Sequence, residues 1–210
     1  SLLIPAGTRV DGADGKVIDT LPASVRRGIN HVYWSMRAQP PRVPKAAQIA
    51  FNSTQGPRVP PGDYTVRMTK DKDVLETTIH VGLDRRVNFT AADRQAQYDA
   101  AVKVRDIFGD MSTLADKINA VRAQASAKAQ KLDAGNALRK QLEALDNKAD
   151  AIRKNIVATK EGGAITGEER LREHTDALYG AIMSYDGKPT EYQLARIGSL
   201  RRELGDIDKQ

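Results

Sequence analysis

Several residue types and motifs are scarce or missing in this chain, and each absence narrows its chemistry. The 210 residues include no cysteine, which excludes disulfide bridges, thiolate nucleophiles and cysteine-bound metals. There is one tryptophan, and aromatic residues make up only 5% of the chain. No apolar run approaches the roughly 20 residues that a membrane-spanning helix needs. The sequence therefore predicts no membrane span.

Common signatures of enzyme active sites are also missing. The chain has no Gly-x-Ser-x-Gly elbow, no phosphate-binding Walker loop and no Gly-x-Gly-x-x-Gly turn. His31 and His80 fall on the outward side of two predicted strands, where a surface metal pair is the alternative to two solvated side chains. Because no third ligand accompanies them, the solvated reading is favoured. We expect no catalytic residues, no cofactor and no metal.

Charge and composition divide the chain into two parts. The net charge is +6, of which residues 1–89 carry +5 and residues 90–210 carry +1. The first part holds the tryptophan and β-branched runs, whereas the second is rich in Ala, Leu, Lys, Glu and Asp. We expect two domains, a β domain at 1–89 and a helical domain at 90–210.

The start of the chain lacks both an initiator methionine and a signal peptide. We therefore expect that Ser1 begins a mature product or a piece of a longer protein.

Alternating apolar residues predict the strands of the β domain. The run His31–Arg37 holds Trp34 on its apolar side, and the runs 64–68 and 75–81 predict a hairpin across a polar turn. Residues 16–21 follow two Asp-Gly turn signals and predict another strand, and residues 47–51 predict a short edge strand. Short strands punctuated by Pro and Gly favour an Ig-like antiparallel β-sandwich.

The most distinctive side chains of the β domain are expected to be structural. Trp34 is large enough to fill the space between two sheets, and Tyr64 is expected to bury its ring and bond its hydroxyl at the rim. The turn Pro60-Pro61-Gly62 sets a rigid entry into the strand that Tyr64 begins.

The helical domain is predicted to hold about four helices in an antiparallel bundle. Thr90 begins a long helix that ends before 133–136, and a coiled-coil-like seam with heptad spacing follows from Leu138 to Ile156. A third helix covers 168–185, a turn follows at 186–188, and a last helix starts at Pro189. Short connections favour a long hairpin made by the first two helices.

Two motifs give the chain a resemblance to a known family. Residues 28–37 match G-x-[HN]-x-x-x-W-D-[LM]-R, except that Ser35 stands where the pattern usually has Asp, and residues 59–68 match P-P-G-x-Y-x-V-x-[LM]. Residues 14–18 match a D-G-K-V-[IV] turn, and residues 189–193 resemble the start of a helical tail. The chain resembles the C-terminal Ig-like and helical region of bacterial exported proteins with a sortilin-type, BNR-repeat β-propeller, often labelled glycosyl hydrolases.

The resemblance implies a non-catalytic structural or interaction module, periplasmic or extracellular, that serves docking or assembly. Any hydrolase activity would reside in an absent propeller. The implied partners are that propeller or another protein. The alanine-rich bundle leaves a homo-oligomer through the helices as a further option, and the modest charge of +5 on residues 1–89 disfavours nucleic acid. The alternative function is binding of an anionic glycan or other polyanion through basic loops that carry Arg26, Arg27, Arg37 and Arg42.

Overall fold

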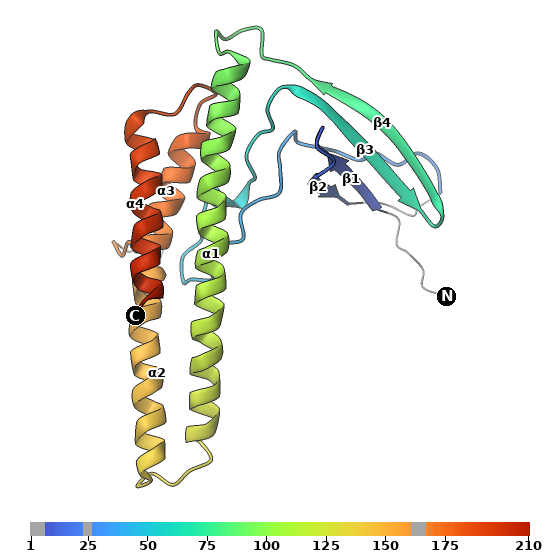
Figure 1. Cartoon of the computed structure of the whole chain (residues 1–210). Helices are drawn as coiled ribbons and strands as arrows, with labels where there is room; N and C mark the ends of the chain where they lie inside the picture. The colour runs from blue at the N-terminus through green and yellow to red at the C-terminus, as the bar shows by residue number, and fades with distance from the viewer. Residues whose placement is uncertain (1–6, 23–26, 161–166) are drawn as a thin grey trace. The chain divides into compact units, whose positions relative to one another are not determined.

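The computed structural model describes residues 7–22, 27–160 and 167–210, and these form an α+β protein with a four-stranded antiparallel sheet and four α-helices (Figure 1). They group into two compact units. The sheet unit comprises Ser1–Pro40, Gln55–Asp99 and Tyr185–Pro189, and the helical unit comprises Pro41–Thr54, Ala100–Ser184 and Thr190–Gln210. The units thus interleave along the chain, whereas the sequence suggested one division after residue 89.

The sheet consists of β1 (Gly7–Asp11), β2 (Val17–Leu21), β3 (Gly62–Lys70) and β4 (Asp73–Val81), in the order β2-β1-β3-β4 (Figure 1). The predicted hairpin is confirmed, with pairs from Gly62↔Val81 to Lys70↔Asp73. Its two-residue turn begins at Asp71, whose φ of 54° suits the left-handed region that such turns require. The β3–β4 hairpin therefore forms where the residues of the turn favour it.

The core of the sheet unit forms around Tyr64. Val10, Leu21, Val59 and Tyr64 are buried together, and Trp34 packs against them half-buried. The rings of Trp34 and Tyr64 lie with centroids 5.3 Å apart. The Tyr64 hydroxyl donates to the Pro60 carbonyl at 2.7 Å, so the tyrosine ties the turn before β3 to the core.

The prediction of a strand over His31–Arg37 is wrong. Residues 31–36 form no strand, and only Arg37 makes an isolated bridge, with Arg58. Met36 takes a φ of 54°, and the Trp34 indole donates to the Arg37 carbonyl at 3.0 Å. Both features curl the segment so that the indole packs against the core.

Residues 47–51 also form no strand, contrary to the edge strand predicted there. The two large apolar side chains of this segment, Ile49 and Phe51, are 80% and 79% exposed. In the described ranges the four strands form one small sheet that does not close, and no second sheet faces it.

The helices follow the predicted sequence: α1 (Ala91–Ala129), α2 (Ala137–Ile156), α3 (Leu171–Met183) and α4 (Glu191–Asp208). The first turn of α1 begins with the predicted capping box, in which Asp93 N donates to Thr90 Oγ1 and Thr90 N donates to Asp93. Asn136 and Thr190 cap α2 and α4 in the same way, through acceptor side chains.

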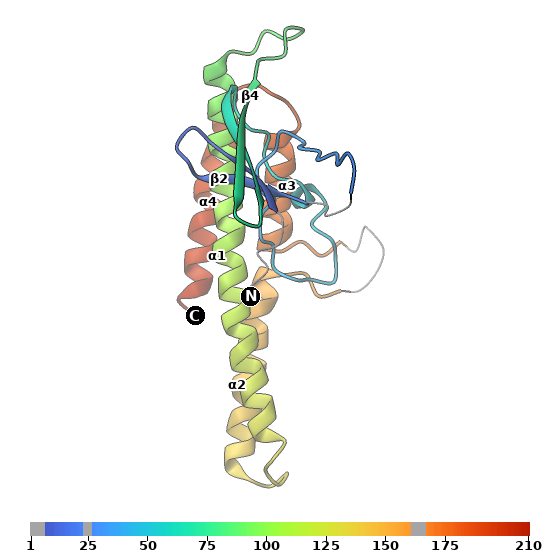
Figure 2. The ribbon, with the colours of Figure 1, turned by 90° about the vertical axis from the view of Figure 1, so that its right-hand side faces the viewer.

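Within the helical unit, α1 and α2 form a hairpin and lie side by side in both views (Figure 1, Figure 2). Arg122 on α1 bridges Asp146 and Asp150 on α2, at 2.8 and 2.9 Å. The fully buried core holds Phe108 and Tyr179, whose rings meet edge to face at 6.4 Å. These large side chains occupy the junction of α1 and α3.

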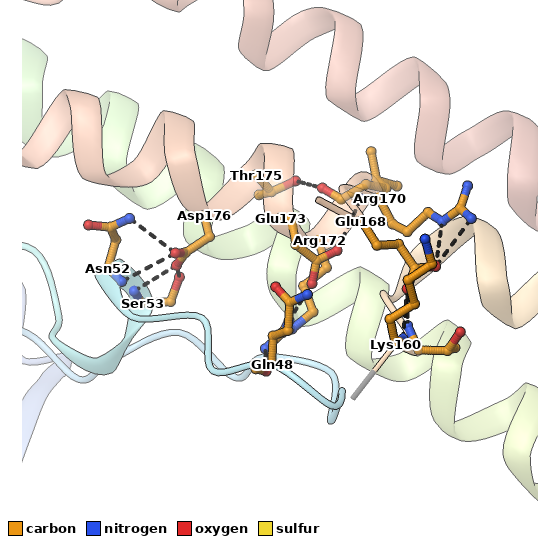
Figure 3. Close-up of polar contacts among 12 residues, drawn as sticks. Gln48, Asn52, Ser53, Lys160, Glu168, Arg170, Arg172, Glu173, Thr175 and Asp176 are labelled. Atoms are coloured by element: carbon orange, nitrogen blue, oxygen red, sulfur yellow. Dashed lines mark hydrogen bonds and ion pairs between the residues drawn. The ribbon is translucent and has the colours of Figure 1, made fainter. Parts of the chain in front are cut away.

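A polar network on α3 holds the segment 41–54 to the helices (Figure 3). Asp176 accepts from Asn52 N and Nδ2 at 3.3 and 3.0 Å, from Ser53 N at 2.9 Å, and from the Ser53 hydroxyl. One turn earlier, Arg172 Nη2 donates to the Gln48 carbonyl at 2.6 Å. These bonds explain why residues 47–54 turn through a 3-10 helix, Asn52–Thr54, instead of joining the sheet.

Candidate functional site

The arginines that the sequence grouped as a basic surface belong to different units. Arg27 is exposed in the sheet unit, and Arg37 is half-buried there, donating through Nη1 to the Gly56 carbonyl at 2.9 Å. Arg42 belongs to the helical unit and pairs with Asp116. Arg26 lies outside the described residues.

Arg37 instead lines a pocket of about 330 Å³ within the sheet unit. We call it the arginine pocket. Its polar lining comes from the ends of segments that are far apart in sequence, namely Arg37, Arg58, Arg94, Asp84 and Asp186. Its apolar lining is Met36, Val59, Pro61, Val81, Leu83, Val87 and Phe89. The pocket therefore joins a charged end to an apolar wall.

Asp186 is the centre of the charged end. Its carboxylate accepts from Arg58 Nη1 at 3.0 and 3.1 Å and from Arg94 Nη1 at 2.9 Å. Arg94, in the first turns of α1, is only 8% exposed and also donates to Gln97. One carboxylate is thus shared by two guanidinium groups, one exposed and one buried.

Burial lowers the pKa of the Arg94 guanidinium, Asp186 opposes this shift, and the like charge of Arg58 adds to it. Burial is the largest of these causes, and the effect of Asp186 is larger than that of Arg58.

The rim of the pocket carries a separate ion pair. Arg86 Nη2 lies 2.6 Å from Asp84 Oδ2, and the Arg86 backbone amide donates to Asp84 at 2.9 Å. Hydrogen bonds from the Arg86 side chain and amide lower the pKa of Asp84 to about 2. Asp84 is therefore charged and already matched by Arg86 at neutral pH.

A second candidate surface is the open side of the sheet. β4 is an edge strand, and eight of its nine residues are exposed. Leu75 and Ile79 lie on the same face of the sheet as their partners on β3, which are Met68 and Tyr64. Leu75 is 61% exposed and Ile79 40%, so this face is buried around Tyr64 and uncovered along β4.

The helical unit also exposes apolar side chains. Of the seam predicted on α2, Ala149 and Ile156 are buried, whereas Leu138 is 52% and Leu145 46% exposed. The first half of the predicted seam therefore lies on the surface of the helical hairpin.

Two of the three histidines lie beside carboxylates. His80 Nδ1 is 2.6 Å from Asp63 Oδ1, and His174 Nδ1 is 3.5 Å from Glu169 Oε2. His31 is exposed. No group of three metal-ligand side chains occurs in the part of the chain that the structure describes.

The arginine pocket escaped sequence reasoning because its charged residues are far apart in the chain: Arg58 and Asp186 alone are separated by 128 positions. Asp186 was interpreted only as part of a turn, and Arg94 as part of a helix. No local pattern indicates that such residues meet, and only Arg37 had been singled out.

Comparison with known proteins adds no relative: no protein-family model, curated protein or solved structure matches the chain. Among the described residues, none of the helices combines the length and the apolar character needed to cross a bilayer.

Proposed function

We propose that this chain is a non-catalytic structural and interaction module of a larger exported β-propeller protein, and that it works by assembly through the open edge of its sheet. The resemblance of residues 28–37 and 59–68 to the Ig-like modules of such proteins supports the parent's identity. The exposed β4 edge is the observation that carries the interaction role.

An open edge strand presents unpaired backbone donors and acceptors to any extended partner. β4 is long for an edge, with nine residues, and has no proline or lysine to discourage pairing. Its apolar Leu75 and Ile79 are exposed on one face. Together these features favour addition of a further strand.

A second copy of β4 fits this edge in an antiparallel register centred on Thr77. That register sets Leu75 opposite Ile79 of the other copy on the apolar face. On the other face Glu76 meets Thr78, so no like charges are opposed. The contact is self-complementary, as a two-fold dimer requires.

The register of the hairpin also directs the correct backbone groups outward. Residues that flank a two-residue turn form a hydrogen-bonded pair, and here these are Lys70 and Asp73. Every second residue of β4 from Asp73 onward makes its backbone hydrogen bonds to β3, and Thr77 is one of these. Glu76 and Thr78 lie between them and direct their amides to the open edge. Glu76 and Thr78 of the two copies are therefore able to bond to each other.

The Ig-like character of the sheet unit is part of the same proposal. The Tyr64 hydroxyl bonds to the carbonyl of Pro60, four residues upstream, as in the tyrosine corner of Ig-like sandwiches. Trp34 beside it fills the core, the role that the strand-C tryptophan has in those domains.

Light scattering after gel filtration tests the assembly. We expect a concentration-dependent dimer, which Thr78→Pro abolishes by removing an outward amide while leaving the β3 pairing in place. Thr78→Val is the matched control and keeps the dimer. Circular dichroism of each variant verifies that the fold is intact.

A chain that stays monomeric at the highest concentration reached refutes assembly through β4. So does a dimer that Thr78→Pro leaves intact and Leu145→Glu disrupts, because the interface then lies on α2. Hydrolase activity in the isolated chain contradicts the non-catalytic role.

A further inference from the structure

The charged end of the arginine pocket holds more positive than negative charge. Arg58 and Arg94 share a single carboxylate, Asp186, whereas Asp84 at the rim is matched by Arg86. Charges in a partly enclosed apolar pocket are screened less than charges on an open surface. The one positive charge that Arg58 and Arg94 leave uncompensated around Asp186 therefore favours an anion there.

The arginines differ in how much of each remains available. Arg94 is buried and directed to Asp186 and Gln97, so it contributes charge more than contacts. Arg58 uses Nη1 for Asp186, and its side chain is 48% exposed. Arg58 is thus the guanidinium placed to meet a ligand.

We propose that the arginine pocket binds one carboxylate group that is attached to an apolar group. A guanidinium matches the two oxygens of a carboxylate in a planar fork, which gives direction as well as charge. The wall formed by Val59, Val81 and Phe89 accepts the apolar part. This inference does not depend on assembly through β4.

The arrangement of charged and apolar side chains in the pocket favours a monoanion over a phosphate dianion. Asp186 stays within the cluster and repels a second negative charge, while the apolar wall offers nothing to solvate it. The same chemistry is carried by a free aliphatic acid and by the C-terminal carboxylate of a peptide with an apolar last residue. These two sources are separated by the probes.

The chain supplies its own reporter of binding. Trp34 is the only tryptophan, and its indole donates to the carbonyl of Arg37 at 3.0 Å. A ligand that engages Arg37 is expected to change the emission of Trp34, whereas a ligand elsewhere is not.

The test is a titration of the whole chain with hexanoate, followed by calorimetry and by Trp34 fluorescence. We expect saturable binding of hexanoate and none of hexan-1-ol, because the carboxylate is required. Arg58→Gln weakens binding about tenfold or more, from the loss of a charged hydrogen bond. Arg58→Lys restores charge but not the fork, so its affinity falls between the two.

Arg85→Gln is the matched control, since it removes an exposed arginine of the same unit that does not line the pocket. Its affinity for hexanoate is expected to equal that of the parent. A short peptide ending in Leu, compared with its C-terminal amide, tells whether a chain terminus is accepted. Tighter binding of the peptide than of hexanoate assigns the terminus as the source, and the reverse assigns the free acid.

Three results overturn the inference. The first is equal binding of hexanoate and hexan-1-ol, and the second is equal weakening by Arg58→Gln and Arg85→Gln. The third is inorganic phosphate binding more tightly than hexanoate, which shows a site for a dianion. Thermal melts of each variant verify folding before binding is compared.

Discussion

Removal of the Asp176 carboxylate tests how the segment 41–54 is held in the helical unit. Asp176→Ala leaves four donors of Asn52 and Ser53 without their acceptor (Figure 3). Asn52 is exposed, so water replaces most of what it loses, whereas Ser53 is 3% exposed. Each buried donor left unsatisfied costs about 1–3 kcal/mol. With two such donors on Ser53 and partial rotation of its hydroxyl, the unfolding free energy should fall by about 3 kcal/mol.

The assay is urea unfolding followed by far-ultraviolet circular dichroism, which reports the helices. Asp116→Ala is the matched control, because it also removes an aspartate from a helix of the same unit. Asp116 and its partner Arg42 are both largely exposed. The control should therefore cost about 1 kcal/mol or less.

A thermodynamic cycle with Ser53→Ala separates this contact from general damage. Ser53→Ala should cost less in the Asp176→Ala background than in the parent, because the shared bond is already lost. Equal losses for Asp176→Ala and Asp116→Ala would refute the reasoning. An additive cycle would refute it as well.

Three further predictions follow from other sites. Gly109→Ala, whose Cβ meets nothing within 4 Å, should raise the unfolding free energy by about 0.5–1 kcal/mol. Gly180→Ala should not raise it, because its Cβ would lie 2.5 Å from an asparagine side chain. Equal increases in the unfolding free energy measured in urea would contradict this. Gly56→Ala places a Cβ 1.7 Å from a backbone carbonyl oxygen and should lower the melting temperature of the sheet unit, with an unchanged melt as the contrary result. The Asp84 carboxyl should titrate near pH 2 by carbon NMR, and its pKa should rise in Arg86→Gln but stay below the ordinary value of about 3.9, because the amide of residue 86 still donates to it. Since the folded-state pKa of Asp84 is lowered, the stability that this carboxylate contributes is present above about pH 4 and is lost as the pH falls toward 2. A titration midpoint of Asp84 near pH 4 in the parent chain would show that its ion pair with Arg86 does not form.

The sequence by itself determined the elements whose signals are local. The hairpin of β3 and β4 follows from a two-residue polar turn between alternating runs, and its register places Leu75, Thr77 and Ile79 on one face as expected. The four helices follow from apolar periodicity, and the start of α1 follows from its cap, Thr90. These features depend on contacts between residues a few positions apart, so the spacing of residue types along the sequence predicts them.

Tertiary contacts decided the rest. Residues 31–36 carry a strand pattern, yet Met36 turns the chain and Trp34 packs half-buried against the core around Tyr64. Residues 47–54 follow Asp176, more than 120 positions away, instead of the sheet. The arginine pocket likewise exists only because Asp186 meets Arg58 across 128 positions. Pairings over such distances leave no periodic trace in the sequence, since each partner is chosen by the shape of the folded chain and not by its neighbours.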